Sequence, residues 1–346
     1  MSETSSLRES GSVAEIRQLP GLVIGVDVGA TKIAAGLVDD QGKILGQTRL
    51  AMPANGTASA GLNAVVSAID LLSARCSVDP RTNPLLRGIG ICSPGPLDPK
   101  RGVIVNPPNL PCWRNFPLAA EVSNIYRVPV SVDNDANAAA LAEARWGAGR
   151  GYPNVFYATI GTGIGTGIVL DGRIYHGRTG AAAEGGHVSV DYRGAKCRCG
   201  KRGCIEVFAS GPAIARRART KLAEGLNHRS AVLELANGDI EAVTSETIGQ
   251  AYEAGDPLAK EVLQETIAFL AHWLGNIVDF LEPDVMVIGG GVALMLSPFF
   301  DEIKNQLPGC CVNSRCQEIP LVMAHYGADT GIAGGAALCA VADHAP

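Results

Sequence analysis

Three apolar runs of this chain end in glycine. They are Leu22–Val28 before Gly29, Val155–Ile160 before Gly161, and Val285–Ile288 before Gly289-Gly290-Gly291. Short runs rich in Val and Ile that stop at a turn residue predict β-strands. The chain holds 42 glycines among 346 residues, above the usual share of roughly 7%. Because glycine has no side chain, backbone at each strand end can approach another group closely. The pattern therefore predicts strands that open onto binding surfaces.

Helical periodicity separates these strands. Apolar residues recur at helical spacing over 57–76. Further helices are predicted over 117–126, 136–146, most of 211–281 and 331–342, and further strands over 33–39, 43–50, 87–92, 128–132, 164–170 and 321–324. Strands and helices that alternate along a chain predict an α/β fold. A strand followed by a hairpin occurs twice, from Leu22 and from Val155, which indicates two related α/β halves with a cleft between them.

Charge and apolar patterning exclude several classes of partner. Charged residues make up 18% of the chain and the net charge is −5, and no basic block offers a surface to a nucleic acid backbone. The stretches 151–170 and 285–300 are broken by glycine or too short to span a membrane, and the N-terminus lacks an apolar signal core. We therefore expect a cytoplasmic enzyme of small molecules, whose cysteines lie in a reducing compartment that favours metal binding over disulfides.

A histidine and three cysteines stand close together in one loop. His187, Cys197, Cys199 and Cys204 offer one imidazole and three thiolates, a complete tetrahedral set for Zn²⁺. Many of the residues between them are glycine, lysine or arginine, which form turns and offset the negative charge of three thiolates. Cys197 and Cys199 lie too near each other in sequence for an easy disulfide. The sequence therefore predicts a structural zinc site in loop 187–204.

Other cysteines are predicted to hold no metal. Cys76, Cys92 and Cys339 are expected to be small core residues. A second cluster has no obvious fourth ligand and is also expected to be free of metal: Cys310, Cys311 and Cys316.

Two glycine loops are candidates for holding phosphate. The first follows the first strand, where backbone N–H groups can approach phosphate oxygens and an acidic residue can hold Mg²⁺ through water. Its candidates are Asp27, Gly29, Thr31 and Lys32. The second loop contains Gly161, Thr162, Gly163 and Gly165. The chain returns from it as a strand and not as a helix, so a dinucleotide-binding fingerprint is rejected. For either loop the alternative is a structural turn.

A third glycine cluster lies between a predicted strand and a helix. At Gly289, Gly290 and Gly291 the backbone could lie against a nucleotide base and its ribose. The alternative is tight packing between strand and helix.

The segment Asp133-Asn134-Asp135 lies at a predicted strand end and opens a helix. A carboxylate at this place can take the proton of an attacking hydroxyl. If that hydroxyl belongs to a sugar, Asn134 can orient the sugar. The alternative is that Asp133 or Asp135 only caps the helix.

These segments together resemble the ROK family, which includes bacterial glucokinases, other hexose and N-acetylhexosamine kinases, and sugar-responsive repressors. Four segments carry the resemblance, in matching order and spacing from about residue 21 to residue 342. They are Asp27–Lys32, Asn134-Asp135, Glu184-Gly185-Gly186-His187, and Cys197–Glu206 with its pattern C-x-C-G-x-x-G-C-x-E. The last pattern is highly specific, whereas the glycine loops are not.

The resemblance implies a two-lobed, actin-like ATPase (ribonuclease H-like) fold with a zinc-binding loop. It implies ATP, Mg²⁺ and structural Zn²⁺ as cofactors, and a homodimer or homotetramer. Asp135 would be the catalytic base, and the sugar-binding residues would be Asn134, Asp135, Glu184, His187 and Glu206. A zinc-bound His187 would keep its other ring nitrogen as a donor to the sugar. Asn109, in the proline-rich loop 93–113, is a further candidate for contact with the sugar.

The expected function is an ATP-dependent hexokinase that phosphorylates glucose. The alternatives are a kinase for N-acetylmannosamine, N-acetylglucosamine or fructose, polyphosphate in place of ATP as donor, and a non-catalytic sugar sensor of the same fold. The presence of Asp135 argues against the sensor. So does the short segment before Leu22, about twenty residues, which is too small for the helix-turn-helix of the family's repressors.

The expected organisation has three parts. Residues 1–20, rich in Ser and Glu, are predicted to be a disordered tail. Residues 21–134 are predicted to form a small α/β lobe, joined by the C-terminal helix 330–346. Residues 135–329 are predicted to form a large lobe that carries the zinc loop.

Overall fold

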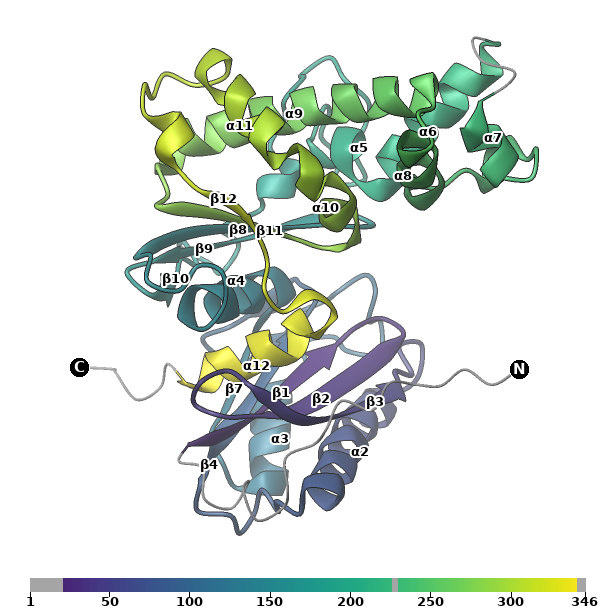
Figure 1. The fold of residues 1–346 in the computed structure, drawn as a ribbon. Helices are drawn as coiled ribbons and strands as arrows, with labels where there is room; N and C mark the ends of the chain where they lie inside the picture. The colour runs from purple at the N-terminus through teal and green to yellow at the C-terminus, as the bar shows by residue number, and fades with distance from the viewer. Residues whose placement is uncertain (1–20, 226–229, 341–346) are drawn as a thin grey trace. The chain divides into compact units, whose positions relative to one another are not determined.

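The computed structural model describes residues 21–225 and 230–340, which form two compact units (Figure 1). Unit 1 comprises residues 21–146, 176–182 and 328–340, and unit 2 comprises residues 147–175 and 183–327, apart from 226–229. The predicted tail, residues 1–20, and the end of the predicted last helix lie outside the described residues. The sequence placed the first boundary after Asn134, whereas the units divide after Trp146. The reason is that α4 (Asp135–Arg145) packs against α12 (Thr330–Ala340) and so belongs to unit 1.

Unit 1 contains a five-stranded mixed sheet in the order β3-β2-β1-β4-β7. Its first three strands are antiparallel neighbours, and β4 and β7 run parallel to β1. The strands are β1 (Leu22–Val28), β2 (Lys32–Val38), β3 (Ile44–Ala51), β4 (Leu86–Ser93) and β7 (Val130–Asn134), with a small separate hairpin of β5 (Leu97–Asp98) and β6 (Val103–Ile104). The remaining helices are α2 (Ala58–Cys76) and α3 (Leu118–Tyr126). The last parallel strand ends two residues later than predicted, at Asn134 rather than Val132.

Glycines allow α12 to lie directly on this sheet. A Cβ atom at Gly25 of β1 would lie 1.9 Å from the carbonyl oxygen of Ile332, and one at Gly90 of β4 would lie 1.8 Å from that of Gly335. No side chain fits at either place. On the opposite face, α2 and α3 bury the alternate residues of the same strands in the main core of the unit. The last helix of the sequence therefore packs directly on the sheet that the first strands form.

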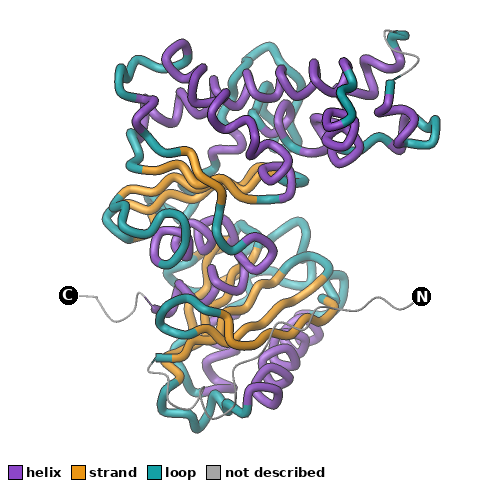
Figure 2. The backbone as a smooth tube through the Cα atoms, in the orientation of Figure 1, coloured by secondary structure: helices purple, strands orange, loops and turns teal. Residues whose placement is uncertain are grey.

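Unit 2 repeats the strand pattern of unit 1, in the order β10-β9-β8-β11-β12. A hairpin strand pair is again followed by two parallel strands. The strands are β8 (Asn154–Ile160), β9 (Ile164–Leu170), β10 (Arg173–Ile174), β11 (Val285–Gly289) and β12 (Leu321–Met323). The helices are α5 (Glu206–Ala209), α6 (Gly211–Ala223), α7 (Ala231–Leu235), α8 (Ser245–Glu253), α9 (Pro257–Leu281), α10 (Gly291–Leu296) and α11 (Phe300–Gln306), and the short 3₁₀ turn η1 is Gly185–His187. Figure 2 shows the helices of this unit gathered on one side of its sheet.

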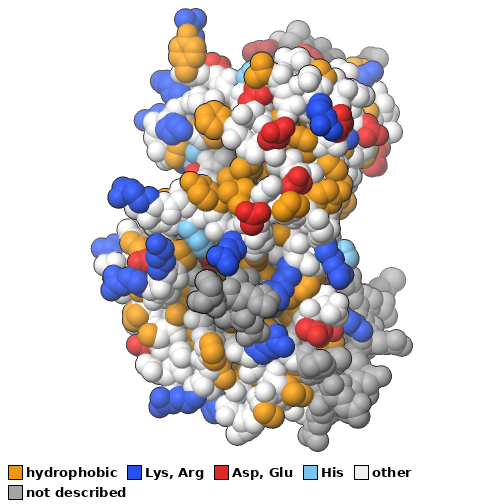
Figure 3. Space-filling model, turned by 90° about the vertical axis from the view of Figure 1, so that its left-hand side faces the viewer, with side chains coloured by type: hydrophobic (Ala, Val, Ile, Leu, Met, Phe, Trp, Pro, Cys, Tyr) orange, Lys and Arg blue, Asp and Glu red, His pale blue; other side chains and the backbone are white. Residues whose placement is uncertain are grey.

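The recurrence of one strand order confirms the predicted α/β class and the two related halves. The chain also returns from Gly161–Gly163 as a strand, as predicted, because β8 and β9 pair antiparallel along their whole length. Among the described residues no helix is both long and apolar enough to cross a membrane. On the face drawn in Figure 3, basic side chains occur together with acidic ones.

Candidate active site

Parallel strands of unit 1 bring three sequence-predicted segments to one edge of the sheet. Asp27 of β1 pairs with Cys92 of β4, and Cys92 pairs in turn with Asp133 of β7. The carboxyl ends of parallel strands meet at the same edge, where α/β folds hold their ligands. Asp27 and the Asn134-Asp135 turn are therefore neighbours in space although more than a hundred residues separate them in sequence.

Asp27 lies in a confined place between β4 and the start of α12. A Cβ atom at Gly331 would lie 2.3 Å from the Asp27 carboxyl carbon, so only glycine fits there. Burial raises the pKa of Asp27, and the negative charge of Asp135 raises it further. A carboxylate whose ionisation is disfavoured by a neighbouring carboxylate forms, together with that neighbour, a place that suits a divalent cation.

The side chain of Cys92 contacts the carboxylate of Asp27. Its side chain is fully buried, and its sulfur lies 3.6 Å from Asp27 Oδ1 and 3.2 Å from the carbonyl oxygen of Gly331. Burial, and after it the charge of Asp27, raises the pKa of this thiol well above its ordinary value, so it remains a thiol that can donate to Asp27. The sequence predicted a small core residue, and the structure adds this contact.

The turn after β7 is capped by its asparagine. Asn134 Oδ1 accepts from the backbone N–H of Ala136 at 2.9 Å and of Asn137 at 3.3 Å. The predicted alternative, a cap by Asp133 or Asp135, is wrong, because Asn134 is the N-cap and Asp135 is the first residue of α4. The cap uses the side-chain Oδ1 of Asn134 and leaves the side-chain NH₂ group as a donor.

Asp135 is exposed at the start of α4, yet the protein around it removes part of the water that would hydrate its carboxylate. This burial raises its pKa, although hydrogen bonds from the Ala136 backbone and from Asn134 act in the opposite direction. A carboxylate with a raised pKa is a better proton acceptor when it is ionised. The environment of Asp135 thus suits a general base.

His176 completes this cluster and was missed by the sequence analysis. Its Nε2 lies 2.5 Å from Asp133 Oδ2. The other carboxylate oxygen of Asp133 accepts from the Asn134 backbone at 2.7 Å and from the Asn137 side chain at 3.2 Å. Asp133 is buried and both of its oxygens are engaged, so it organises the turn. No local sequence signal pairs a residue at 176 with one at 133.

The first glycine loop forms a tight turn. The Gly29 N–H donates to the carbonyl oxygen of Lys32 at 2.9 Å, and Thr31 and Lys32 are exposed. These two exposed residues can offer donors to a ligand beside Asp27.

The glycines of the second loop, in unit 2, have different surroundings. Gly161 has open space around its Cβ position, whereas a Cβ atom at Gly163 would lie 2.7 Å from Glu206 Oε2. The same oxygen of Glu206 accepts from the Ile164 N–H at 3.0 Å. Gly165 lies within the strand pair, opposite Thr159. Gly161 therefore faces open space, while Gly163 makes room for Glu206.

A pocket of about 520 Å³ opens beside Gly161, within the usual size range of small-molecule sites. The N-terminus of α6 faces it, as suits an anion, and Arg219 holds its rim by donating to the carbonyl oxygen of Val243 at 3.1 Å. The lining residues are Gly161, Thr162, Gly211, Pro212, Ala215, Arg219, Val243, Thr244, Ser245, Glu246, Gly291 and Val292. Three of them were predicted from the sequence, whereas those of α6, those around the start of α8 and Val292 of α10 were not.

The third glycine cluster contributes one residue to this pocket. Gly291 lines it. A Cβ atom at Gly290 would lie 2.3 Å from the Ile160 carbonyl oxygen, and one at Gly289 would lie 3.0 Å from the Tyr157 hydroxyl. The packing alternative therefore accounts for Gly289 and Gly290.

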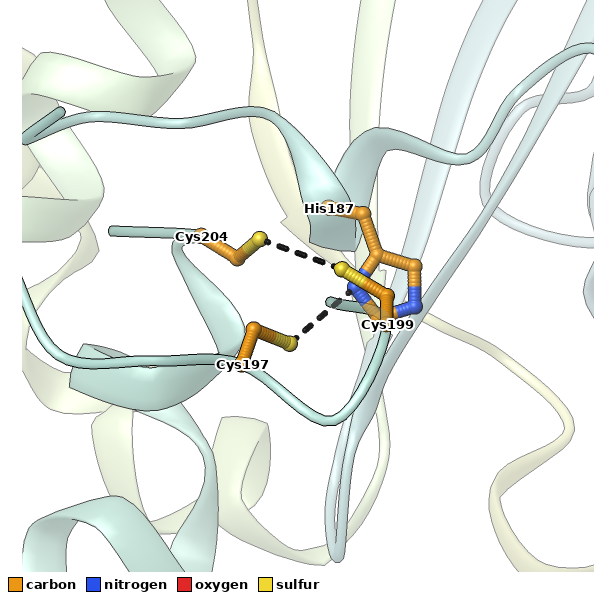
Figure 4. Close-up of side chains that lie close together, drawn as sticks. All are labelled: His187, Cys197, Cys199 and Cys204. Carbon is orange, nitrogen blue, oxygen red and sulfur yellow. Dashed lines mark hydrogen bonds between the residues drawn. The ribbon is translucent and has the colours of Figure 1, made fainter. Parts of the chain in front are cut away.

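The four predicted zinc ligands come together in unit 2 (Figure 4). Their ligand atoms all lie within 4.8 Å of one another. Cys199 and Cys204 have their sulfurs 3.6 Å apart, and Cys197 Sγ lies 3.6 Å from His187 Nδ1. Two sulfurs bound to one tetrahedral zinc at ~2.3 Å would be about 3.8 Å apart. The donor set and its spacing therefore fit a zinc ion.

Backbone contacts fix the loop that carries these ligands. The Cys197 N–H donates to Lys201 at 2.8 Å, and the Gly200 N–H donates to Cys197 at 3.0 Å. The Lys201 ammonium donates to the His187 carbonyl oxygen at 2.7 Å. His187 turns its Nδ1 toward the cysteines, which leaves Nε2 on the other side of the ring.

Glu184 and Asn109 are both exposed. Glu184 precedes η1. Trp273 holds η1 in place, because its Nε1 donates to the Gly185 carbonyl oxygen at 3.0 Å. A Cβ atom at Gly186 would lie 1.9 Å from the carbonyl oxygen of Ile164, so this segment needs its glycine to cross β9. Asn109 lies in a turn of unit 1 that the Leu110 N–H closes.

Known proteins resemble this chain along nearly its whole length. Residues 23–341 match the ROK family. A glucokinase from Streptomyces coelicolor is 33% identical over 92% of this chain and 97% of its own length, and an N-acetylmannosamine kinase from Yersinia pseudotuberculosis is 30% identical over 91% and 97%. The crystal structure of a ROK family glucokinase from Streptomyces griseus in complex with glucose and AMPPNP has a TM-score of 0.73 and 34% identity, covering 91% of this chain and 98% of that one. The resemblance inferred from the sequence is confirmed, and the chain belongs to the ROK family, with its actin-like α/β fold.

Proposed function

We propose that this ATP-dependent sugar kinase transfers the γ-phosphoryl group of MgATP to a hydroxyl of glucose. The observation that carries the proposal is the pair of carboxylates Asp27 and Asp135, which the parallel register of β1, β4 and β7 brings to the carboxyl edge of the first sheet. Phosphoryl transfer needs a base for the hydroxyl and a cation for the phosphates. Similarity to glucokinases supports glucose as the acceptor.

Each carboxylate has its own part in this proposal. Asp135 accepts the proton of the attacking hydroxyl, and the amide of Asn134 orients the sugar. Asp27 holds Mg²⁺, directly or through water, beside the donors of Thr31 and Lys32. Because the transition state is loose, positioning and charge neutralisation contribute more than base strength.

The pocket beside Gly161 is proposed to hold the nucleotide. It offers a glycine turn and a helix N-terminus for phosphates, and space bounded by Arg219 and Val243 for the base. A polyphosphate donor would need no such space, and this favours ATP.

We further propose that Zn²⁺ at His187, Cys197, Cys199 and Cys204 supports sugar recognition. Four protein ligands close the tetrahedron, so such an ion has no position for water and acts through structure. Cys197 Sγ lies 3.9 Å from Glu206 Oε1, so the same loop sets the position of Glu206. His187 Nε2, Glu184 and Glu206 are then proposed sugar contacts, and Asn109 is proposed as a further one.

The acceptor is tested by coupled ADP release over a panel of glucose, mannose, fructose, N-acetylmannosamine and N-acetylglucosamine. We expect the highest kcat/KM for glucose. The second candidate is N-acetylmannosamine, because a kinase for that sugar is 30% identical to this chain. A tenfold preference for either N-acetylhexosamine would replace glucose as the acceptor, and no turnover with any sugar would refute the function itself.

A further inference from the structure

One short segment of the chain changes its unit. Residues 176–182 belong to unit 1, although the chain before them, through β10, and after them, into Glu184, belongs to unit 2. The segment closes on itself through the Ala182 N–H, which donates to the His176 carbonyl oxygen at 3.2 Å. It forms a compact loop that is held at two places in unit 1.

The first holding point is the proline-rich loop. Gly180 adopts a φ of +88°, and a Cβ atom there would lie 2.9 Å from Cδ of Pro99. Gly180 therefore provides both the left-handed turn and the close approach to the hairpin that follows β4. The segment 176–182 packs directly on the loop that also carries Asn109.

The second holding point is the catalytic turn. His176 Nε2 lies 2.5 Å from Asp133 Oδ2, and the side chain of Asp133 is only 5% exposed whereas that of His176 is 30% exposed. The opposite oxygen of Asp133 holds the Asn134 N–H and the Asn137 amide. His176 thus acts on the turn through one buried carboxylate that has no oxygen left for a substrate.

We propose that His176 is a positioning residue for sugar phosphorylation. By holding Asp133 it fixes the direction of Asn134 and Asp135. This inference rests on the proposed function, because it assigns roles to the same site. His176 itself touches neither sugar nor nucleotide in this proposal.

Two substitutions separate positioning from stability. His176→Phe keeps the ring and removes the hydrogen bond, whereas His176→Gln keeps an N–H donor near the position of Nε2. We expect His176→Phe to lower kcat/KM for the sugar at least tenfold while the KM for ATP stays within twofold. His176→Gln should recover activity to within about threefold of the wild type. His272→Phe, on the exposed face of α9, is the control and should behave as the wild type.

A spectroscopic measurement reports on the contact without turnover. In ¹⁵N-labelled protein the Nε2–H of His176 should give a far-downfield proton resonance that is lost in His176→Phe and in Asp133→Asn. Absence of this resonance from the wild type would overturn the inference. So would normal kinetic constants in His176→Phe, or equal losses in the Phe and Gln variants that follow a lower melting temperature. If the wild type phosphorylates no sugar of the panel, the proposed function fails and the inference fails with it. An active wild type with an equally active Phe variant refutes the inference alone.

Discussion

Asp135 must be ionised to act as a base, whereas its surroundings favour the protonated form. Burial raises its pKa above the ordinary aspartate value of 3.8. The site thus holds a group that is unfavourable for folding at neutral pH and useful for catalysis. Such trade-offs between stability and activity are common at active sites.

The substitution Asp135→Asn tests this directly. Turnover should fall by about 10²–10⁴, the usual effect of losing a general base. In the wild type, kcat should fall as the pH is lowered through the raised pKa of Asp135, at a higher pH than for an ordinary aspartate. Steady-state kinetics between pH 4 and pH 8 measure both effects. Near-normal kcat in the variant would remove Asp135 from the mechanism.

The substitution Asp135→Asn should raise the stability of the folded protein at neutral pH although it lowers turnover. The folded state binds the Asp135 proton more tightly than the unfolded state does, so this contribution is full below the unfolded pKa and is lost as the pH rises through the folded pKa. Asparagine mimics the protonated form and can still accept from the Ala136 N–H. Asp135→Asn should therefore melt at a higher temperature than the wild type at pH 7, with a smaller difference at pH 4. Calorimetry at both pH values measures it, and a lower melting temperature at pH 7 would contradict the account.

At the scale of elements, the hairpin of β8 and β9 serves two sites with two neighbouring glycines. Gly161 lines the pocket and has open space at its Cβ position, whereas Gly163 lies against the carboxylate of Glu206. From the sequence, both glycines were predicted to approach phosphate. The structure instead directs the Cβ position of Gly163 toward a residue proposed to bind sugar.

Two matched substitutions distinguish these glycines. Gly161→Val should raise the KM for ATP at least tenfold, because the side chain enters the pocket, and should leave the KM for glucose within twofold. Gly163→Ala should displace only the flexible end of Glu206, and so raise the KM for glucose severalfold with little effect on ATP. Both variants should keep melting temperatures close to the wild type. An ATP effect of Gly163→Ala larger than its glucose effect would refute the assignment.

At the scale of the whole molecule, the proposed zinc site and the proposed nucleotide pocket share no residue, although both belong to unit 2. The loop carries His187 and leads to Glu206, while the pocket is built by α6, α10 and the segment before α8. Losing the metal should therefore affect the two substrates unequally.

Elemental analysis should find one Zn²⁺ per chain. Removal of the metal by a chelator, or the substitution Cys199→Ser, should weaken glucose binding at least tenfold in calorimetric titration, while ATP binding stays within about threefold. Cys112→Ser, a partly exposed thiol of unit 1, is the control. Metal-free protein that binds glucose normally would refute the coupling. Protein purified without a chelator that contains no zinc would refute the site.

Local patterns in the sequence determined most of the elements and the cluster of one histidine and three cysteines that is proposed to bind zinc. The spacing of apolar residues depends on which side of a strand or helix is buried, so it can be read from a short stretch of sequence. The four ligands lie within eighteen positions, so a single loop brings them together without help from the rest of the fold. For the same reason the strand Leu22–Val28 was predicted to the residue, and the β7 strand was displaced by only two residues.

Tertiary structure alone decided how distant segments meet. The contact of Cys92 with Asp27 spans 65 residues, and that of Cys92 with Gly331 spans 239. Both depend on the parallel register of β1 with β4 and on the docking of α12 over glycines. The pairing of His176 with Asp133, and the direction of Gly163 toward Glu206, depend likewise on packing across the whole core. No short-range pattern encodes such contacts, because each is fixed by the combined burial of many residues far apart in the chain.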